Sequence, residues 1–510
     1  MFSRLKSVGL YGMDSYMIEV EADISNGLPS FDIVGLPDAA VKESRDRVRA
    51  AIKNCGFKFP VSRITVNLAP AHLKKEGSLY DLPVLLSILK ASGQLKAEFE
   101  DVITVGEVAL DGKLRSINGA LAIAITAKEN GISSIFVPEE NAAEAAVIEG
   151  VDVYGAKNIK EIIDHLTNVK LLEKAEHTYC EQEEIANILD FCDVKGQIAA
   201  KKALEVAAAG GHNILLIGPP GAGKSMLAKR LPSILPQMTF EESIETTKIH
   251  SIAGTLDNKK PFLNVRPFRS PHHTISAAGI AGGGTVPKPG EISLAHNGVL
   301  FLDELPEFRR DVMEALRQPI EDGKVTISRV AGSLTYPSSI MLVAAMNPCP
   351  CGFYGHPTRN CTCTSNAVHK YLSRISGPML DRIDLHVEVP PVDYNALSSK
   401  QKEESSAEIR ERVNNARKIQ QERYKGTGIT CNARLTSALI KKYCVLTEDA
   451  SKYLQLSFDR LGMSARAYDR ILKVARTIAD LEGSEIIEKT HIFSAISFRS
   501  LDRKYWSQGV

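Results

Sequence analysis

One stretch of this chain constrains its fold more than any other: residues 213–225 read NILLIGPPGAGKS. The apolar run from Ile214 to Ile217 is typical of a short buried strand. Glycines then interrupt the strand, and a helical pattern begins at Met226. A Gly-x4-Gly-Lys-Ser sequence between a strand and a helix is a phosphate-binding P-loop. The stretch therefore predicts an α/β domain that binds a nucleotide.

The loop residues have separate physical tasks. Glycines allow backbone N–H groups to turn inward around phosphate oxygens. We expect Lys224 to reach the β- and γ-phosphates of ATP and Ser225 to ligate Mg²⁺. A glycine-rich turn without a ligand is the alternative, which the match at every position makes remote. The predicted nucleotide-binding residues of the loop are Gly218, Pro219, Pro220, Gly221, Ala222, Gly223, Lys224 and Ser225.

Two further apolar runs end in polar residues that suit the same site. Residues 299–302 are followed by Asp303 and Glu304, about eighty residues after the P-loop. We expect Asp303 to hold Mg²⁺ and Glu304 to polarise the attacking water. Residues 340–345 lead to Met346 and Asn347, whose amide is predicted to orient that water near the γ-phosphate.

A cysteine cluster follows directly, with Cys-x-Cys pairs at 349–351 and 361–363. Nine cysteines with four close together indicate a reducing compartment and a metal site more than a disulfide framework. Free thiols or two disulfides are the alternatives, and His356 and His369 are possible substitute ligands. The predicted ligands of a structural Zn²⁺ are Cys349, Cys351, Cys361 and Cys363.

The segment 249–298 is rich in Gly, Pro, Ser and His and is predicted to be a long functional loop. It contains FRSPHHT, with His272 and His273 adjacent. A metal site there is disfavoured because neighbouring side chains diverge. A loop that faces DNA or senses the nucleotide is the preferred interpretation.

The length of 510 residues indicates about three domains. We predict a β/α-alternating domain over 1–170, a polar linker over 171–186, the ATPase domain over 187–390 and a helical domain over 391–510. In the helical part, Arg470, Lys473 and Arg476 recur at helical spacing. They form either a stripe that contacts phosphates or, as we prefer, a solvated face.

Composition excludes some function classes. The net charge is +1, so the whole chain carries no strong field that would attract DNA. No apolar run is long enough to cross a membrane, and no secretory signal is visible. We expect a cytoplasmic protein without a membrane partner.

The N-terminal segments LAPAHLKKEGSLYDLPVLLSIL and VGEVALDGKLRSINGALAIAITAKENGISSIFVP resemble the Lon-protease-like domain, an α+β domain of the ribosomal S5 domain 2 type. The resemblance covers about residues 5–168 and places the catalytic serine at Leu79 and the catalytic lysine near residues 121–123. These positions are apolar, and Ser78 lacks a matching base in the sequence. The resemblance therefore implies a non-proteolytic domain that serves assembly or contacts nucleic acid.

The motifs FRSPHHT, FLDELPEF, MNPCPCG, SGPMLDRIDL and SARAYDRILKVARTIADL follow in order. Along nearly the whole chain, this order resembles the ComM/YifB family of magnesium-chelatase-like AAA+ ATPases, which have a central P-loop domain and a C-terminal helical lid. The resemblance implies that Asn347 is the sensor-1 residue and that Arg466 is the sensor-2 residue facing the nucleotide. It also makes Val194 and Gly196 candidate contacts of the adenine, and an ordinary helix N-terminus is the alternative for these two residues.

The resemblance also implies that Arg382 is an arginine finger that reaches the γ-phosphate held by a neighbouring subunit. A surface ion pair with Asp381 or Asp384 is the alternative, and Arg374 is the second candidate for the finger.

For function, the resemblance implies an ATP-driven hexameric ring with helicase activity that promotes DNA branch migration during natural transformation and recombination. The alternative is a chelatase-like remodelling subunit, whose ring drives a partner that inserts Mg²⁺ into a porphyrin. An ATP-dependent protease is disfavoured because the Ser/Lys pair is absent.

Overall fold

The computed structural model describes residues 1–176, 189–257, 260–284, 288–329, 332–392 and 403–506. These residues form two compact units. The first unit comprises Met1–Glu181 and Phe240–Leu263, and the second comprises Gln182–Thr239 and Asn264–Val510. The predicted fold class is confirmed, with an N-terminal α+β unit, an α/β P-loop region built on a parallel sheet, and a helical C-terminal region.

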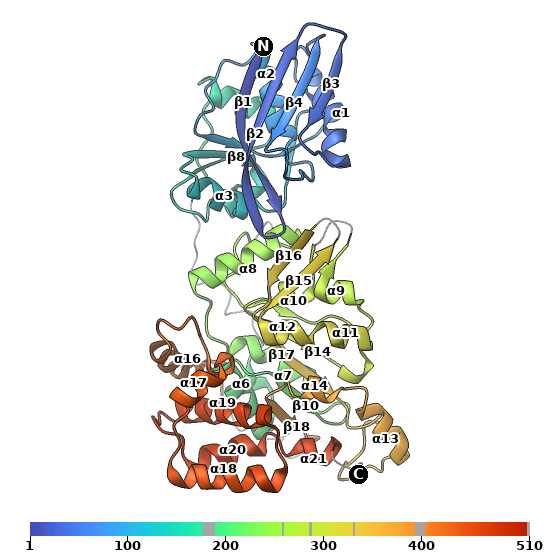
Figure 1. Ribbon diagram of the computed structural model, residues 1–510, viewed down its shortest axis with the longest axis vertical. Helices are drawn as coiled ribbons and strands as arrows, with labels where there is room; N and C mark the ends of the chain where they lie inside the picture. The colour runs from blue at the N-terminus through green and yellow to red at the C-terminus, as the bar shows by residue number, and fades with distance from the viewer. Residues whose placement is uncertain (177–188, 258–259, 285–287, 330–331, 393–402, 507–510) are drawn as a thin grey trace. The chain divides into compact units, whose positions relative to one another are not determined.

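A seven-stranded mixed sheet forms the first unit, in the order β3-β4-β2-β1-β5-β8-β9 (Figure 1). The strands β1 and β2 form an antiparallel hairpin, whereas β1, β5, β8 and β9 run parallel. The strand bounds are β1 Phe2–Tyr11, β2 Asp14–Ser25, β3 Ser30–Val34, β4 Arg63–Ala69, β5 Val102–Thr104, β8 Ser134–Pro138 and β9 Asp152–Ala156.

The strand β1 was not predicted, because its inward face carries serines among apolar residues. Ser3 and Ser7 are buried, and each hydroxyl donates to a backbone carbonyl, of Ser87 and Thr104 respectively. A hydroxyl that donates a hydrogen bond can be buried in a core at little cost. The serines nevertheless interrupt the alternation of apolar and polar residues by which a strand is predicted from sequence.

Five helices cover this sheet together with a small ribbon. The helix α1 starts where Asp38 caps it by accepting from Val41 N at 2.8 Å. The largely apolar residues 102–108 are predicted to form one strand, but the structure divides them, because Gly106 O accepts from Leu82 N in the first turn of α2 rather than continuing a ladder. The bounds are α1 Ala39–Asn54, α2 Asp81–Ala91, α3 Ala120–Glu129, α4 Glu139–Ala145, α5 Ile159–Leu166, β6 Glu107–Val108 and β7 Leu114–Arg115.

The helix α8 (Phe240–Ala253) belongs to the first unit, although it lies within the predicted ATPase range. The Ser251 hydroxyl donates to the Glu144 carboxylate and accepts from Gly119 N at 2.9 Å. Burial raises the pKa of Glu144. Ile244 and Phe262 pack against the core of this unit. The chain thus leaves the second unit after Thr239 and returns at Asn264, an excursion that local sequence patterns cannot show.

The start of the predicted linker also belongs to the first unit. Ala175 N donates to Val153 O at 2.8 Å, and Leu172 packs against the core. These residues extend the edge of the sheet, whereas 177–186 lie outside the described residues.

A five-stranded parallel sheet organises the second unit, in the order β11-β14-β17-β10-β18. Three of its strands, β10, β14 and β17, are buried along their whole length, as strands covered on both faces must be. The bounds are β10 Ile214–Ile217, β11 Phe268–Arg269, β14 Val299–Leu302, β17 Met341–Met346 and β18 Leu385–Glu388.

Short helices and ribbons connect these strands, so the predicted long loop over 249–298 is not one continuous loop. The α-helices are α6 Ile198–Gly210, α7 Lys224–Arg230, α9 Ala277–Ala281, α10 Glu291–Leu294, α11 Arg310–Ala315, α12 Arg317–Asp322, α13 Ser365–Leu372 and α14 Gly377–Leu380. The 3₁₀ turns and ribbon strands are η2 Phe191–Asp193, η3 Leu231–Ser233, η4 Leu305–Glu307, β12 Gly282–Gly283, β13 Lys288–Pro289, β15 Lys324–Arg329 and β16 Gly332–Pro337.

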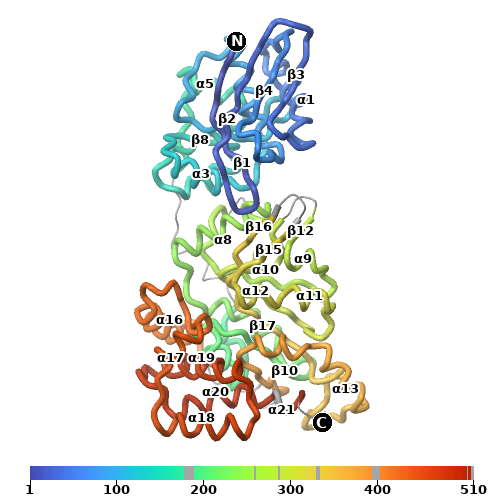
Figure 2. Tube along the Cα trace, in the orientation of Figure 1, coloured from blue at the N-terminus to red at the C-terminus, as the bar shows by residue number. Residues whose placement is uncertain are grey.

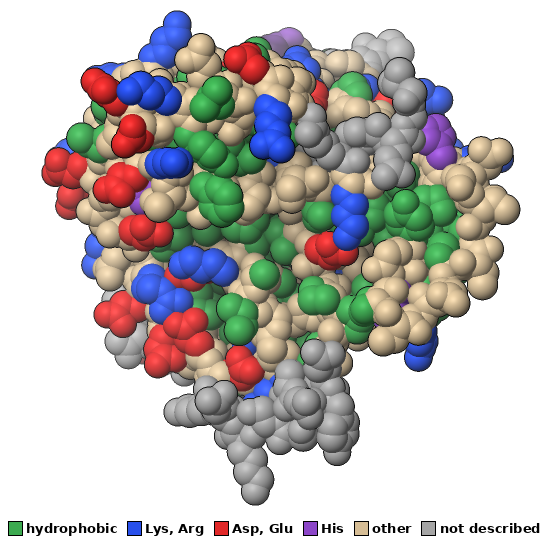
Figure 3. All heavy atoms as spheres, turned by 90° about the horizontal axis from the view of Figure 1, so that it is seen from below, with side chains coloured by type: hydrophobic (Ala, Val, Ile, Leu, Met, Phe, Trp, Pro, Cys, Tyr) green, Lys and Arg blue, Asp and Glu red, His purple; other side chains and the backbone are tan. Residues whose placement is uncertain are grey.

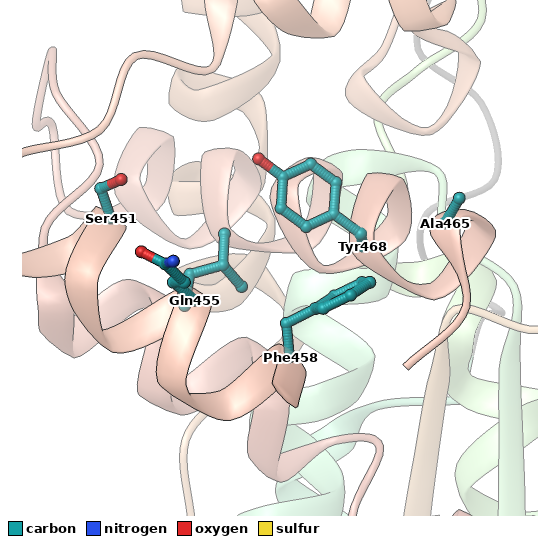
Figure 4. Close-up of a pocket in the computed structure, with 6 residues that line it drawn as sticks. Ser451, Gln455, Phe458, Ala465 and Tyr468 are labelled. Atoms are coloured by element: carbon teal, nitrogen blue, oxygen red, sulfur yellow. The ribbon is translucent and has the colours of Figure 1, made fainter. Parts of the chain in front are cut away.

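The C-terminal part is helical, and α18, α19 and α20 lie side by side (Figures 1 and 2). Between α18 and α19, the rings of Phe458 and Tyr468 meet edge to face at 6.1 Å beside a shallow apolar hollow of about 450 Å³ (Figure 4). The bounds are α16 Ser406–Arg423, η5 Asn432–Arg434, α17 Ser437–Tyr443, α18 Glu448–Leu461, α19 Ala465–Leu481, α20 Lys489–Ser497 and α21 Leu501–Trp506.

The basic residues of α19 do not form the predicted solvated face or phosphate stripe. Arg476 is fully buried and pairs with Asp480 at 3.0 Å. Arg470 donates to Ile383 O at 3.4 Å, and Lys473 donates to Ala433 O at 3.0 Å. Both interpretations were wrong because these cations satisfy carbonyls and a carboxylate inside the unit, which spacing alone cannot distinguish from solvation.

Candidate active site

Parallel strand register brings the predicted ATP-site residues together at one end of the five-stranded sheet. Lys224 Nζ donates to Gly218 O at 2.7 Å, to Pro219 O at 2.9 Å and to Asn347 Oδ1 at 3.1 Å. Ser225 Oγ donates to Asp303 Oδ2 at 2.6 Å. Because β10, β14 and β17 are neighbours that point the same way, the residues following each strand converge.

Lys224 is only 8% exposed, and this burial has an electrostatic consequence. Desolvation lowers the pKa of Lys224 to about 8, although Asp303 and Glu304 favour its ammonium form. Its ammonium group rests on two carbonyl oxygens of the P-loop. These partners are weak substitutes for phosphate oxygens, so the group is poised to exchange them for an anion.

Glu304 occupies a strained position. Its φ is +54°, in the left-handed region that residues other than glycine rarely adopt. Its N–H donates to Asp303 Oδ1 at 2.9 Å, and its Oε2 lies 3.3 Å from His273 Nδ1. His273 in turn lies edge-on to Phe308 and 4.1 Å from the ring of His272. The FRSPHHT segment therefore contacts the predicted catalytic carboxylate.

This contact was missed by the sequence analysis, which considered the two histidines only as part of a loop. No local signal links residue 273 to residue 304. The link follows from the parallel pairing of β11 with β14, which carries both segments to the same edge.

Gln197 is a second residue that the sequence analysis missed. Its Nε2 donates to Ala222 O of the P-loop at 3.1 Å and to Pro390 O at 2.6 Å. Of the predicted adenine contacts, Val194 is buried in the core, and Gly196 N donates to Glu403 Oε1 at 3.0 Å. Val194 therefore presents no free surface to a base in this structure.

Arg382 lies at the opposite end of the sheet from the P-loop. Asn213, which precedes β10, donates through Nδ2 to Arg382 O at 2.9 Å. Lys224 follows the other end of β10, whose four residues span about 13 Å at about 3.3 Å per residue. The Arg382 guanidinium pairs with Glu321 and donates to Arg317 O at 3.0 Å. The alternative of a pair with Asp381 or Asp384 is therefore wrong.

The other two predicted arginines lie on different sides of the unit. Arg374 pairs with Glu307 at 2.7 Å, directly after the acidic pair of its own chain. Arg466 is exposed in the first turn of α19, where Ser464 and Ala467 line a hollow of about 690 Å³ together with Asp381. Arg466 thus lies near the Arg382 segment, and the structure does not bring it to the P-loop of its own chain.

The four clustered cysteines form a compact group of sulfur atoms. Their Sγ atoms all lie within 4.8 Å of one another, and three of the pairs are 3.3, 3.5 and 3.7 Å apart. Tetrahedral Zn²⁺ with Zn–S bonds of about 2.3 Å separates its sulfurs by about 3.8 Å, whereas a disulfide requires about 2.05 Å. The four thiols are free, so the disulfide alternative is wrong and the donor set fits zinc.

Local hydrogen bonds favour a thiolate at one position of this group. Backbone N–H donors of Phe353 and Thr362 lower the pKa of Cys351 to about 5, which favours the thiolate that binds metal. His356 and His369 do not belong to the group of ligand atoms, and His356 Nδ1 instead accepts from Thr358 N and Arg359 N at 3.1 Å.

The Lon-like positions of the first unit are apolar and buried. Leu79, Leu121 and Ile123 all belong to its core. Ser78, for which no base was expected, does have a partner, because its hydroxyl donates to the Glu107 carboxylate. Lys75 Nζ donates to Leu73 O at 2.8 Å and to Pro70 O.

Comparison with known proteins shows to which family the chain belongs. Family models described as "Subunit ChlI of Mg-chelatase", "Magnesium chelatase, subunit ChlI" and "Magnesium chelatase, subunit ChlI C-terminal" match residues 20–141, 190–397 and 403–499. The protein YifB of Salmonella typhimurium is 46% identical over 495 residues, 96% of each chain. The competence protein ComM of Haemophilus influenzae is 45% identical over 499 residues, again 96% of each. The chain belongs to the ComM/YifB family of magnesium-chelatase-like proteins.

Membership of the ComM/YifB family supports the assignment of an AAA+ ATPase to the second unit. The Lon protease 2 of Bacillus subtilis is 30% identical over 146 residues, 26% of each chain, which agrees with the Lon-like resemblance. Among the helices that the structure describes, none is both long and apolar enough to span a membrane.

Proposed function

We propose that this ComM/YifB family member is an ATP-hydrolysing ring motor, a hexamer by resemblance, that acts on DNA as a branch-migration helicase in natural transformation and recombination. The separation of Arg382 from the P-loop carries the ring assignment. A guanidinium serves phosphoryl transfer when it contacts the developing charge. Within one chain, Arg382 and Lys224 lie at opposite ends of β10, so we infer that Arg382 serves the nucleotide of an adjoining subunit.

The residues of each chain divide the chemistry. Lys224 exchanges its carbonyl partners for the β- and γ-phosphates, and Asn347, now bonded to Lys224, orients the attacking water. Glu304 accepts the proton of that water. Ser225 and Asp303, already 2.6 Å apart, would hold Mg²⁺, which neutralises charge on the phosphates when bound.

Two side-chain contacts must open before this site is complete. Glu304 has to leave His273, and Arg382 has to leave Glu321. Both carboxylates are more than half exposed, so the pairs are weak and open at small cost. Hydrolysis therefore depends on events at both ends of the sheet.

The ribbon β15–β16 is the proposed DNA contact. Thr326, Ser328, Ser333 and Thr335 place their hydroxyls on its exposed face, while its apolar side chains are buried on the other. Hydroxyls donate well to phosphate oxygens. The chain continues from the ribbon through Ser338 into β17, which ends beside Asn347. A force that DNA exerts on the ribbon can therefore be transmitted along β17 to the position of the γ-phosphate.

The face at the α18 and α20 end of the second unit is less suited to DNA. Figure 3 shows Lys and Arg there interspersed with Asp and Glu around hydrophobic side chains. Exposed apolar residues of these helices include Leu456 and Phe493. Mixed charges give little net attraction for a polyanion.

The deciding experiment is the steady-state ATPase rate with and without single-stranded and forked DNA. We expect DNA to raise kcat, and we expect the stimulation to fall when Thr326 and Thr335 are both replaced by Ala. Lys452→Ala, a change in α18 outside both sites, is the control. A rate unaffected by either DNA would contradict the motor proposal.

A chelatase-like remodelling role is the second candidate, favoured by the descriptions of the three matching family models. It predicts an ATPase rate that is the same with and without DNA and that rises when chelatase partner subunits and a porphyrin are added. The DNA experiment with these additions distinguishes the two functions.

We also infer that Cys349, Cys351, Cys361 and Cys363 hold one structural Zn²⁺. Four thiolates complete a tetrahedral shell and leave no position for a reactive water. Elemental analysis of protein purified without chelator should find one zinc per chain, and a Cys361→Ser/Cys363→Ser variant should have lost it. Wild-type protein without zinc would refute the site.

A further inference from the structure

The loop of residues 349–363, here called the thiol loop, is seated directly against the P-loop. A Cβ added to Gly352 would lie 2.4 Å from Pro220 Cδ and 3.1 Å from its Cγ. Real Cβ atoms do not approach that closely, so the Gly352 backbone is packed on the proline ring with no space between them. The structure thus joins a motif that suits a metal to the loop that binds phosphate.

The residues just before the thiol loop contact the P-loop at two further points. Met346 O accepts from Gly218 N at 3.2 Å, and Asn347 Oδ1 accepts from Lys224 Nζ at 3.1 Å. With Gly352 against Pro220, three residues within the seven-residue span 346–352 contact the start, the middle and the lysine of the P-loop.

The sulfur cluster determines the shape of the thiol loop. The described residues 350–363 contain no helix or strand, and most of their side chains are exposed or half-buried. Cys349 Sγ accepts from Tyr354 N at 3.3 Å, and Gly352 N donates to Cys349 O at 3.0 Å. Gly352 therefore lies within a turn that two hydrogen bonds to Cys349 stabilise, one to its sulfur and one to its carbonyl oxygen. A short loop without a core of its own takes its fold from a bound metal.

We propose that the thiol loop is a metal-dependent support for the P-loop, so that metal retention and nucleotide binding are linked. The proposal rests on the zinc and ATP sites proposed above. A metal that holds Gly352 in place keeps the P-loop in its phosphate-binding shape, and loss of the metal releases it. Linkage is reciprocal, so bound nucleotide strengthens metal binding by the same factor.

The first experiment measures this linkage on the full-length, zinc-loaded protein. Equilibrium competition with a chromogenic chelator gives the zinc affinity with and without ADP, and fluorescent ADP gives the nucleotide affinity with and without zinc. We expect both affinities to change by the same factor of about tenfold. A zinc affinity that is the same with and without saturating ADP would overturn the proposal.

Two glycines of the loop provide a matched pair of variants. Gly352 and Gly355 have φ of +84° and +74°, so an alanine strains the backbone similarly at either position. Only Gly352 faces Pro220, whereas a Cβ on Gly355 would meet nothing within 4 Å. We expect Gly352→Ala to weaken ADP binding by about tenfold and Gly355→Ala to leave it within about twofold.

Zinc content and thermal unfolding of both variants show whether either loop has collapsed. Pro220→Ala tests the contact from the other side, because it leaves the thiol loop intact and should reduce the linkage while zinc is retained. Equal ADP affinities for Gly352→Ala and Gly355→Ala would contradict the proposal that the thiol loop supports the P-loop. Wild-type protein without zinc would refute the metal site and its linkage, while the paired glycine variants would still test the contact.

Discussion

The two ends of the five-stranded sheet in the second unit differ in completeness. At the carboxyl end, Lys224, Ser225, Asp303 and Asn347 already bond to one another within a single chain. At the amino end, the Arg382 guanidinium is held by Glu321 and by backbone carbonyls, with no phosphate site of its own chain nearby. The comparison supports the proposal that binding and catalysis have different requirements, with the cradle from one chain and the arginine from an adjoining chain.

The strongest test of this comparison is Arg382→Ala. We expect kcat to fall by about 10³–10⁵-fold, because the γ-phosphate loses the cation that stabilises its developing charge. Nucleotide binding should persist, since every cradle residue remains. Arg309→Ala, which removes an exposed arginine that pairs with Asp311 of its own chain, is the control.

A mixing experiment sharpens the same point. Arg382→Ala subunits have an intact cradle, whereas Lys224→Ala subunits have an intact arginine. In randomly mixed rings, about a quarter of the interfaces combine the two intact halves. We expect the mixture to recover measurable ATPase activity that neither variant shows alone, and no recovery would contradict a shared site.

Glu304→Gln should slow ATP hydrolysis at the carboxyl end of the sheet without weakening nucleotide binding. We expect kcat to fall by about 10²–10⁴-fold, because the amide cannot accept a proton from the attacking water. Fluorescent-nucleotide titration should show affinity close to that of the wild type. Wild-type turnover in this variant would exclude Glu304 as the base.

The pH dependence of nucleotide binding tests the Lys224 environment. Burial lowers the pKa of Lys224 to about 8 in the free protein, so the ammonium form is lost as pH rises through that value. Affinity should be constant below pH 8 and then fall by up to about tenfold per pH unit. Lys224→Ala should bind weakly at every pH without this step, and a flat wild-type profile to pH 9.5 would contradict the assignment.

The smallest expected effect is that of Glu321→Ala, which releases Arg382 from its partner within the chain. The pair is partly exposed, so we expect ATPase activity at limiting subunit concentration to rise by only about two- to fivefold. Glu314→Ala, which breaks the Arg317 pair close by in sequence, is the control. A fall in activity would show that Glu321 positions Arg382 productively.

Much of the second unit could be predicted because its signals are local. The P-loop, the acidic pair after β14 and the amide after β17 each follow a buried strand, and parallel register makes such positions converge. Helices over 448–461, 465–481 and 489–497 can likewise be predicted from the sequence, and these are the bounds of α18, α19 and α20.

The sequence by itself determined that this chain carries a P-loop motif and that four cysteines lie close together, because those features depend on short, contiguous spacings. Only the tertiary structure decided which residues face each other across the fold. It paired His273 with Glu304, turned Arg476 inward, placed Gly352 on Pro220 and assigned α8 to the first unit. Those outcomes depend on packing between segments distant in the chain, and neither periodicity nor motif spacing encodes such packing.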